Sequence, residues 1–190
     1  FGILKFSRIY MMEIPLTFFP FMGAMSFYSF ITFNQRKDLL LASIFVALGC
    51  LVKGPVSLAM GYLSIGTYLL FEKFVYKKND NYFKPFFELI IMSLCISSLW
   101  FVLCFLEHGN KFIEYFFLRE NLGKFDSKWM SPLKIPQGLI LYLLPWLFLV
   151  PQSIKSIFKE YKNNNLIRYI SIHFIVFFSI WLIPAQKSHH

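Results

Sequence analysis

Long stretches without a charged residue recur along this chain and constrain its fold more than any other feature. The segment 14–33 (IPLTFFPFMGAMSFYSFITF) carries no charge, and neither does 89–106. Further uncharged stretches cover 39–52, 54–71, 135–154 and 169–186, the last of which contains one histidine. A bilayer core about 30 Å thick takes about 20 apolar residues in a helix. The pattern therefore predicts helices that cross a membrane.

The composition excludes most other classes of protein. Only 15% of the residues are charged, whereas a soluble domain carries roughly 25%, so a soluble enzyme, a disordered chain, a collagen and a disulfide scaffold are excluded. The net charge of +9 does not indicate nucleic acid, because the basic residues lie between apolar stretches and form no basic face. The cysteines lie within apolar stretches without metal-like spacing, and so they indicate no metal site.

We predict an all-α transmembrane bundle that forms one domain over residues 1–190 and has six spans. The expected spans lie near 14–33, 39–53, 55–71, 86–106, 136–154 and 167–185. The second and third spans could instead form one long helix kinked before Pro55. Two helices are favoured, because 33 continuous helical residues would extend about 50 Å, which is too long for one crossing.

Six crossings place the connecting segments alternately on two sides of the membrane. One side holds 1–13, Lys53, 107–134 and 187–190, and the other holds 34–38, 72–88 and 155–168. The second side carries ten of the nineteen basic residues, some in compact clusters beside helix ends such as Arg36-Lys37 and Lys77-Lys78. Cytoplasmic segments collect Lys and Arg, so we expect the second side to be cytoplasmic.

Most polar residues that could support chemistry lie on the first side. Lys53 lies between two apolar helices, so its ammonium either extends to the interface or binds an anion such as phosphate. Glu13, at the start of the first span, is either a solvated helix cap or a functional acid. His173, alone in an apolar span, is interpreted as a hydrogen-bonded packing residue. The adjacent His189 and His190 could serve as metal ligands or as a base.

Segment 107–134 is expected to form an external juxtamembrane loop. Within it, apolar and aromatic residues recur with helical spacing opposite charged residues. This pattern predicts an interfacial helix within 110–122. Arg119 and Lys124 near its end could hold a lipid phosphate, Arg through a planar fork and Lys as a point charge. The alternative is a plain amphipathic connector.

Five motifs resemble, in the same order, those of bacterial members of the protein O-mannosyltransferase superfamily. They are SRIYMMEIPLTFF, which contains Arg8 and Glu13; ALGCLVKGPVSLAM, with its Leu-x-Lys-Gly-Pro; the Phe-rich FIEYFFLRENLGKF; LILYLLPWLFLVP, with its Pro-Trp; and AQKSHH. Within this superfamily the chain resembles the 4-amino-4-deoxy-L-arabinose transferases that modify lipid A. Two positions depart from the family pattern: Glu13 replaces an Asp, and Lys124 replaces an Arg and thereby loses the bidentate fork.

The resemblance implies a type C glycosyltransferase (GT-C) fold, a multi-span helical enzyme whose site lies at the outer membrane face. Such enzymes transfer a sugar from a polyprenyl-phosphate donor to a lipid, glycan or protein acceptor, with inversion at the anomeric carbon. The family's catalytic carboxylate lies in an external loop between spans that precede Phe1. We therefore expect an internal fragment of a longer multi-pass protein of the bacterial inner membrane, and we name no catalytic residue.

The expected donor site lies on the first side of the membrane. Lys53, Arg119 and Lys124 are expected to bind the donor phosphate, because cations stabilise the phosphate leaving group as the glycosidic bond breaks. The residues expected to line the same cavity are Arg8, Glu13, Lys187, His189 and His190. No metal ligand is assigned, and the cofactor stays open, a divalent metal included. The alternative function is a membrane transporter or a non-catalytic membrane subunit.

Overall fold

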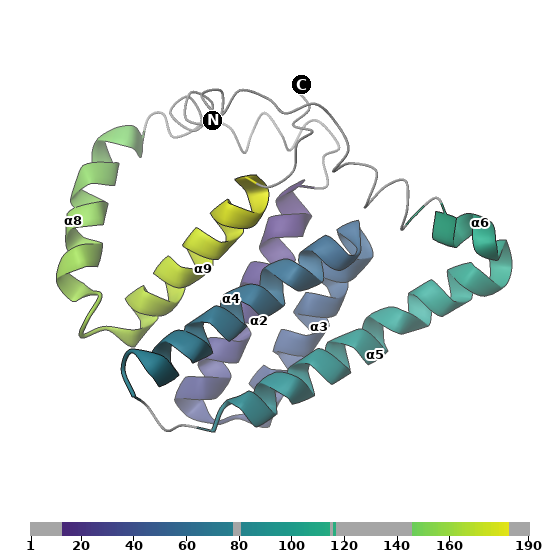
Figure 1. The fold of residues 1–190 in the computed structure, drawn as a ribbon, viewed down its shortest axis with the longest axis horizontal. Helices are drawn as coiled ribbons and strands as arrows, with labels where there is room; N and C mark the ends of the chain where they lie inside the picture. The colour runs from purple at the N-terminus through teal and green to yellow at the C-terminus, as the bar shows by residue number, and fades with distance from the viewer. Residues whose placement is uncertain (1–12, 78–80, 115, 117–145, 183–190) are drawn as a thin grey trace.

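The computed structural model describes residues 13–77, 81–114, 116 and 146–182, and the regular structure within these ranges is entirely helical. The elements, labelled as in Figure 1, are α2 (Glu13–Phe33), α3 (Arg36–Lys53), α4 (Pro55–Phe74), α5 (Phe83–His108), α6 (Asn110–Ile113), the 3₁₀ helix η3 (Trp146–Leu149), α8 (Val150–Glu160) and α9 (Asn165–Leu182). The prediction of an all-α protein is confirmed for these residues.

The centre of the bundle is built where α2, α3 and α4 approach one another closely. A Cβ atom added to Gly23 of α2 would lie only 2.7 Å from Val46 Cγ2 of α3, and one added to Gly49 of α3 would clash with Ser57 Oγ of α4. Small residues at helix interfaces let the backbones approach within van der Waals contact over a long stretch, which is the main source of cohesion between helices in lipid.

The chain turns sharply between α3 and α4 at a single residue. Gly54 has φ 67° and ψ −144°, a conformation that residues with a Cβ rarely adopt. Its N–H donates to the carbonyl of Cys50 at 2.7 Å, and Pro55 then begins α4, where the missing N–H costs nothing. Residues 39–71 are therefore two helices, as the Gly-Pro pair predicts.

Helix α9 is attached to the bundle through a buried tyrosine. Tyr169 donates from its hydroxyl to the carbonyl of Ala24 on α2 at 2.7 Å and is only 1% exposed. Its ring meets Tyr28 and Tyr68 at centroid distances of 4.9 and 4.7 Å. The helix begins after Asn164, whose Oδ1 accepts from the N–H of Leu166, as an N-cap residue does. These contacts bring together residues about 145 positions apart.

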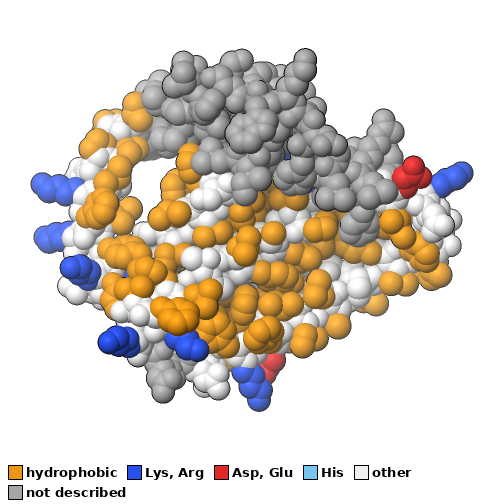
Figure 2. Space-filling view, in the orientation of Figure 1, with side chains coloured by type: hydrophobic (Ala, Val, Ile, Leu, Met, Phe, Trp, Pro, Cys, Tyr) orange, Lys and Arg blue, Asp and Glu red, His pale blue; other side chains and the backbone are white. Residues whose placement is uncertain are grey.

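The outer surface of the bundle is strongly apolar. Within the described residues, two helices are long and apolar enough to cross a bilayer, Ile14–Phe33 and Phe83–His108, and Asn165–Ile180 is a shorter apolar helix. On α5, Leu99 is 68% exposed and Leu106 is 74% exposed. Figure 2 shows hydrophobic side chains over most of the visible described surface. Water would penalise so much exposed apolar area, whereas lipid would not. The six crossings remain a prediction.

The expected span 136–154 differs from the structure in its described part. Residues 136–145 lie outside the described residues, and Trp146–Leu149 form a 3₁₀ turn rather than part of a straight helix. Helix α8 then begins at Val150, with Pro151 in its first turn, and continues to Glu160, beyond the expected end of the span and into a segment expected to be a loop. Proline at the start of a helix favours a new segment over the continuation of an old one. We missed this helix because an uncharged stretch was read as a single span.

The juxtamembrane segment begins with a second sharp turn. Helix α5 continues to His108, Gly109 adopts φ 58°, and α6 starts at Asn110. The rings of Phe112 and Phe116 stack at 5.4 Å and both pack near Phe101 of α5. A helix therefore begins where the interfacial helix 110–122 was predicted, while most of the rest of that range, Arg119 included, lies outside the described residues.

Candidate functional site

The expected donor site belongs to the end of the bundle at which α3 passes into α4, called here the Lys53 end. Lys53 is the last residue of α3, and Glu13 is the first residue of α2. Gly49 lies against Pro20, so antiparallel α2 and α3 place these two residues at the same end. The remaining expected site residues, Arg8, Arg119, Lys124, Lys187, His189 and His190, lie outside the described residues, so their convergence on this end stays a prediction.

Lys53 ends α3 at its junction with α4, where the dipoles of the two helices act on its charge in opposite senses. It is half-buried, and it follows the last carbonyl groups of α3, whose helix dipole is negative at this end. The positive N-terminal end of α4 starts two residues later at Pro55. One turn further on, Ser57 is fully buried and its Oγ has no hydrogen-bond partner in the part of the chain that the structure describes. The Lys53 end thus holds a half-buried lysine residue directly before the N-terminus of α4, where an anion is favoured.

The end of α5 adds further charged groups on the same side. Ser97 lies beside Cys50 of α3, and ten further residues carry α5 about 15 Å beyond that level. Glu107, His108, Lys111 and Phe112 line an open depression there. Arg119 and Lys124 follow Phe112 within twelve positions in the sequence. No three His, Cys, Asp or Glu side chains gather as a metal site within the described ranges.

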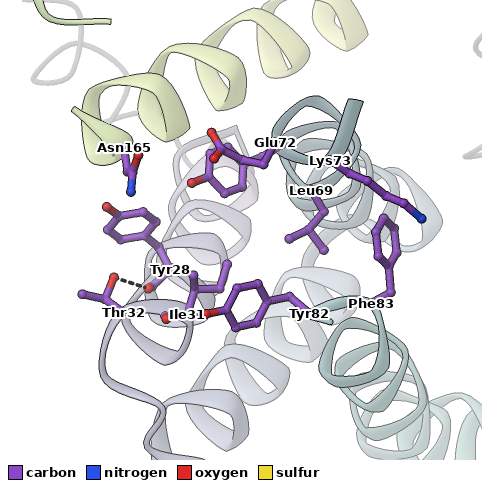
Figure 3. Close-up of a pocket in the computed structure, with 10 residues that line it drawn as sticks. Tyr28, Ile31, Thr32, Leu69, Glu72, Lys73, Tyr82, Phe83 and Asn165 are labelled. Atoms are coloured by element: carbon purple, nitrogen blue, oxygen red, sulfur yellow. Dashed lines mark hydrogen bonds between the residues drawn. The ribbon is translucent and has the colours of Figure 1, made fainter. Parts of the chain in front are cut away.

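The best-formed cavity lies at the opposite end of the bundle, called here the Arg168 end. It measures about 200 Å³ and is lined mainly by polar and aromatic side chains (Figure 3) from α2, α4, the start of α5 and the start of α9. The lining residues are Tyr28, Ile31, Thr32, Tyr68, Leu69, Glu72, Lys73, Tyr82, Phe83 and Asn165. Our sequence analysis assigned no site here, and this cavity lies far from the expected donor end.

Glu72, which lines this cavity, belongs to a buried ion pair with Arg168. Arg168 is 1% exposed, Glu72 is 6% exposed, and the Nε of Arg168 donates to Oε1 of Glu72. The guanidinium also donates to the carbonyl of Tyr161 at 2.8 Å and to Oδ1 of Asn165 at 2.6 Å, and it lies 3.9 Å from the centre of the Tyr76 ring. These several partners of the guanidinium are what allow two charges to be buried. The pair joins α4 to α9 and to the turn before it.

Sequence reasoning missed this pair and treated Arg168 only as one of several cytoplasmic cations. The partners are 96 positions apart, and a sequence without an alignment offers no signal for such a distant contact. A weak signal does exist: each residue stands next to a long uncharged stretch, where a charge needs a partner.

His173 also differs from its interpretation. It is 5% exposed and packs against Phe177 and Phe21, with ring centroids at 4.1 and 5.4 Å. The packing role is therefore confirmed. The hydrogen bond is not: neither ring nitrogen has a partner among the described residues. Edge-to-face and tilted contacts with these two phenylalanine rings, rather than hydrogen bonds, hold the imidazole in place.

Comparison with known proteins gives one positive finding. A family model described as dolichyl-phosphate-mannose-protein mannosyltransferase matches residues 1–113, which is more than half of the chain. The matched range includes the segments around Glu13 and Lys53 and ends with the last residue of α6. No curated protein and no solved structure matches the chain.

Proposed function

The chain belongs to the dolichyl-phosphate-mannose-protein mannosyltransferase family, and on that premise we propose that it transfers a sugar from a polyprenyl-phosphate donor. The proposed acceptor is a lipid, a glycan or a protein at the outer face of a bacterial inner membrane, as in the lipid A-modifying enzymes that the motifs resemble. Family membership and the apolar exterior of the helices indicate a membrane glycosyltransferase.

The observation that carries the proposal is the position of Lys53 within the matched range. This half-buried lysine is the last residue of α3, in a bundle whose exterior suits lipid. A polyprenyl-phosphate donor keeps its isoprenoid tail among acyl chains and its phosphate at the interface, so its binding site needs cations where apolar helices end. Lys53 meets that requirement.

We assign Lys53, Arg119 and Lys124 to the donor phosphate. Cations held beside the phosphate stabilise the negative charge that develops when the bond between the sugar and the phosphate breaks. Arg8, Glu13, Lys187, His189 and His190 are proposed to line the same cavity. No residue of this chain is proposed as the catalytic base.

The test is sugar transfer by the full-length protein in proteoliposomes with a lipid-linked donor. Lys53→Ala should lower turnover about tenfold or more, because a hydrogen bond to a charged group contributes about 1.5–3 kcal/mol. Lys53→Arg keeps the charge and should retain part of the activity. Lys37→Ala is the matched control, since Lys37 is an exposed lysine on the same helix at the Arg168 end. Equal turnover of Lys53→Ala and wild type would show that Lys53 only anchors α3 at the interface.

A further inference from the structure

Helix α8 has two contrasting faces. Val150, Ile154, Ile157 and Phe158 recur at spacings of four, three and one, which places them along one side of the helix. Lys155 and Lys159 lie on the other side. Lys162 follows one residue after the end cap, and Glu160 is the single acidic residue of the segment 150–162. Three lysines against one glutamate give this segment a net charge of +2.

The apolar face of α8 has no protein partner among the described residues. Phe158 is 80% exposed, Ile154 is 47% exposed, and no residue of α8 is buried. In Figure 1 the helix stands at the margin of the bundle, and in Figure 2 an open gap separates it from the remaining helices. An apolar face of this size in water would be costly, so α8 needs an apolar surface to lie against.

One end of α8 is fixed at the Arg168 end of the bundle. Arg168 donates to the carbonyls of Tyr161 and Lys162, which directly follow α8, at 2.8 and 3.1 Å. The same arginine pairs with Glu72 of α4. The C-terminal end of α8 is therefore held where α9 begins, at one end of the bundle, although no residue of α8 itself is buried.

The lysines determine how α8 can lie relative to a bilayer. Figure 1 shows α8 alongside α9. With α9 crossing the membrane, this arrangement would carry Lys155 about 10 Å from the level of Lys162. A lysine inside the hydrocarbon is costly unless it reaches the headgroups. A tilt of α8 into the plane of the interface removes that cost and keeps the apolar face among acyl chains.

We propose that α8 is an interfacial helix that binds the anionic lipid surface at the Arg168 end of the bundle. Val150, Ile154, Ile157 and Phe158 face the acyl chains, and Lys155, Lys159 and Lys162 lie among the anionic headgroups. The lysines favour a lipid surface over a protein partner. An anionic bilayer offers both acyl chains for the apolar face and negatively charged headgroups for the lysines. The inference concerns membrane attachment and does not depend on the donor.

The experiment uses the full-length protein with an environment-sensitive fluorescent amino acid at position 158 or 156. Phe158 belongs to the apolar face, and Ser156 lies on the polar side. In vesicles of phosphatidylcholine with phosphatidylglycerol, we expect brominated acyl chains to quench the probe at 158 and to leave the probe at 156 unquenched. Equal exposure of both probes to water in these vesicles would overturn the proposal.

The dependence on lipid charge separates a membrane from a covering protein segment. Lys155→Gln with Lys159→Gln should lower the ratio of inserted to free helix in anionic vesicles roughly fivefold for each lysine. The control, Lys37→Gln with Lys84→Gln, removes two exposed charges from other helices of the same end and should leave the ratio unchanged. A probe at 158 that is shielded from water in anionic vesicles but not quenched by the brominated acyl chains would show that protein covers this face, and would also overturn the proposal.

Discussion

Two ion pairs at the Arg168 end differ in burial and therefore in their expected contribution to stability. Arg168 and Glu72 are both buried, and the arginine has further partners in two carbonyl groups and in Asn165. The pair between Arg36 and Glu88 involves the same kinds of group, but the Arg36 side chain is 71% exposed. Water and salt screen the exposed pair, and water can solvate either charge when its partner is lost. A buried charge that loses its partner has no water to solvate it.

We therefore expect losses of stability of very different size for the same substitution at the two arginines. Arg168→Ala should lower the free energy of unfolding by about 3–5 kcal/mol, because Glu72 is left in an apolar environment without its counter-charge. Arg36→Ala should lower it by at most about 1 kcal/mol. Chemical unfolding of both variants in detergent measures the difference. The double variant Arg168→Met, Glu72→Leu should recover much of the loss, and equal stability of the two alanine variants would contradict the assignment of a buried pair.

At the scale of helices, the sequence predicts helix boundaries and breaks best, because these depend on residues that are neighbours in the chain. The break at Gly54 follows from the conformational freedom of glycine and the proline after it, and four of the helices match their uncharged stretches closely. The pairing of Glu72 with Arg168 depends on contacts between distant segments, which hydropathy does not encode. Helix α8 was missed for another reason: its apolar face and the preceding apolar stretch were counted as one span, although Lys155 and Lys159 mark an amphipathic helix.

Packing between helices can be tested at two glycines. Gly49→Ala should destabilise the protein and reduce sugar transfer, because the new Cβ would collide with Ser57 Oγ and press on Pro20, both on neighbouring helices. Gly66→Ala is the control, since its Cβ would meet Phe86 at 3.5 Å, an ordinary van der Waals distance. Thermal unfolding in detergent should give a lower midpoint for the Gly49 variant alone. A Gly49 variant as stable as the Gly66 variant would mean that α2, α3 and α4 are less closely packed than described.

At the scale of the whole molecule, the two ends of the bundle differ in their charged groups. The Lys53 end carries a half-buried cation inside the family-matched range, and the Arg168 end carries the buried ion pair, the basic clusters and α8. The excess of clustered Lys and Arg at the second end favours a cytoplasmic location for it. The donor site and the lipid-binding helix would then face opposite leaflets.

Orientation is measured by labelling single cysteines in intact cells with a reagent that does not cross the membrane. A cysteine at Ser127 in the full-length protein, with Cys50, Cys95 and Cys104 replaced, should react from outside the cell. A cysteine at Asn163, beside α8, should react only after the membrane is permeabilised. The reverse pattern would place the Lys53 end in the cytoplasm and separate the proposed site from the outer face.

The central claim is that this protein takes its sugar from a lipid carrier, and the direct measurement is the fate of that carrier. Full-length protein in proteoliposomes would be given a polyprenyl-phosphate donor with a labelled sugar, together with membrane lipids and glycans as acceptors. The account predicts release of polyprenyl phosphate and movement of the label to an acceptor, whereas a nucleotide sugar added instead should leave the acceptor unlabelled. An intact lipid-linked donor, or transfer from the nucleotide sugar alone, would contradict it.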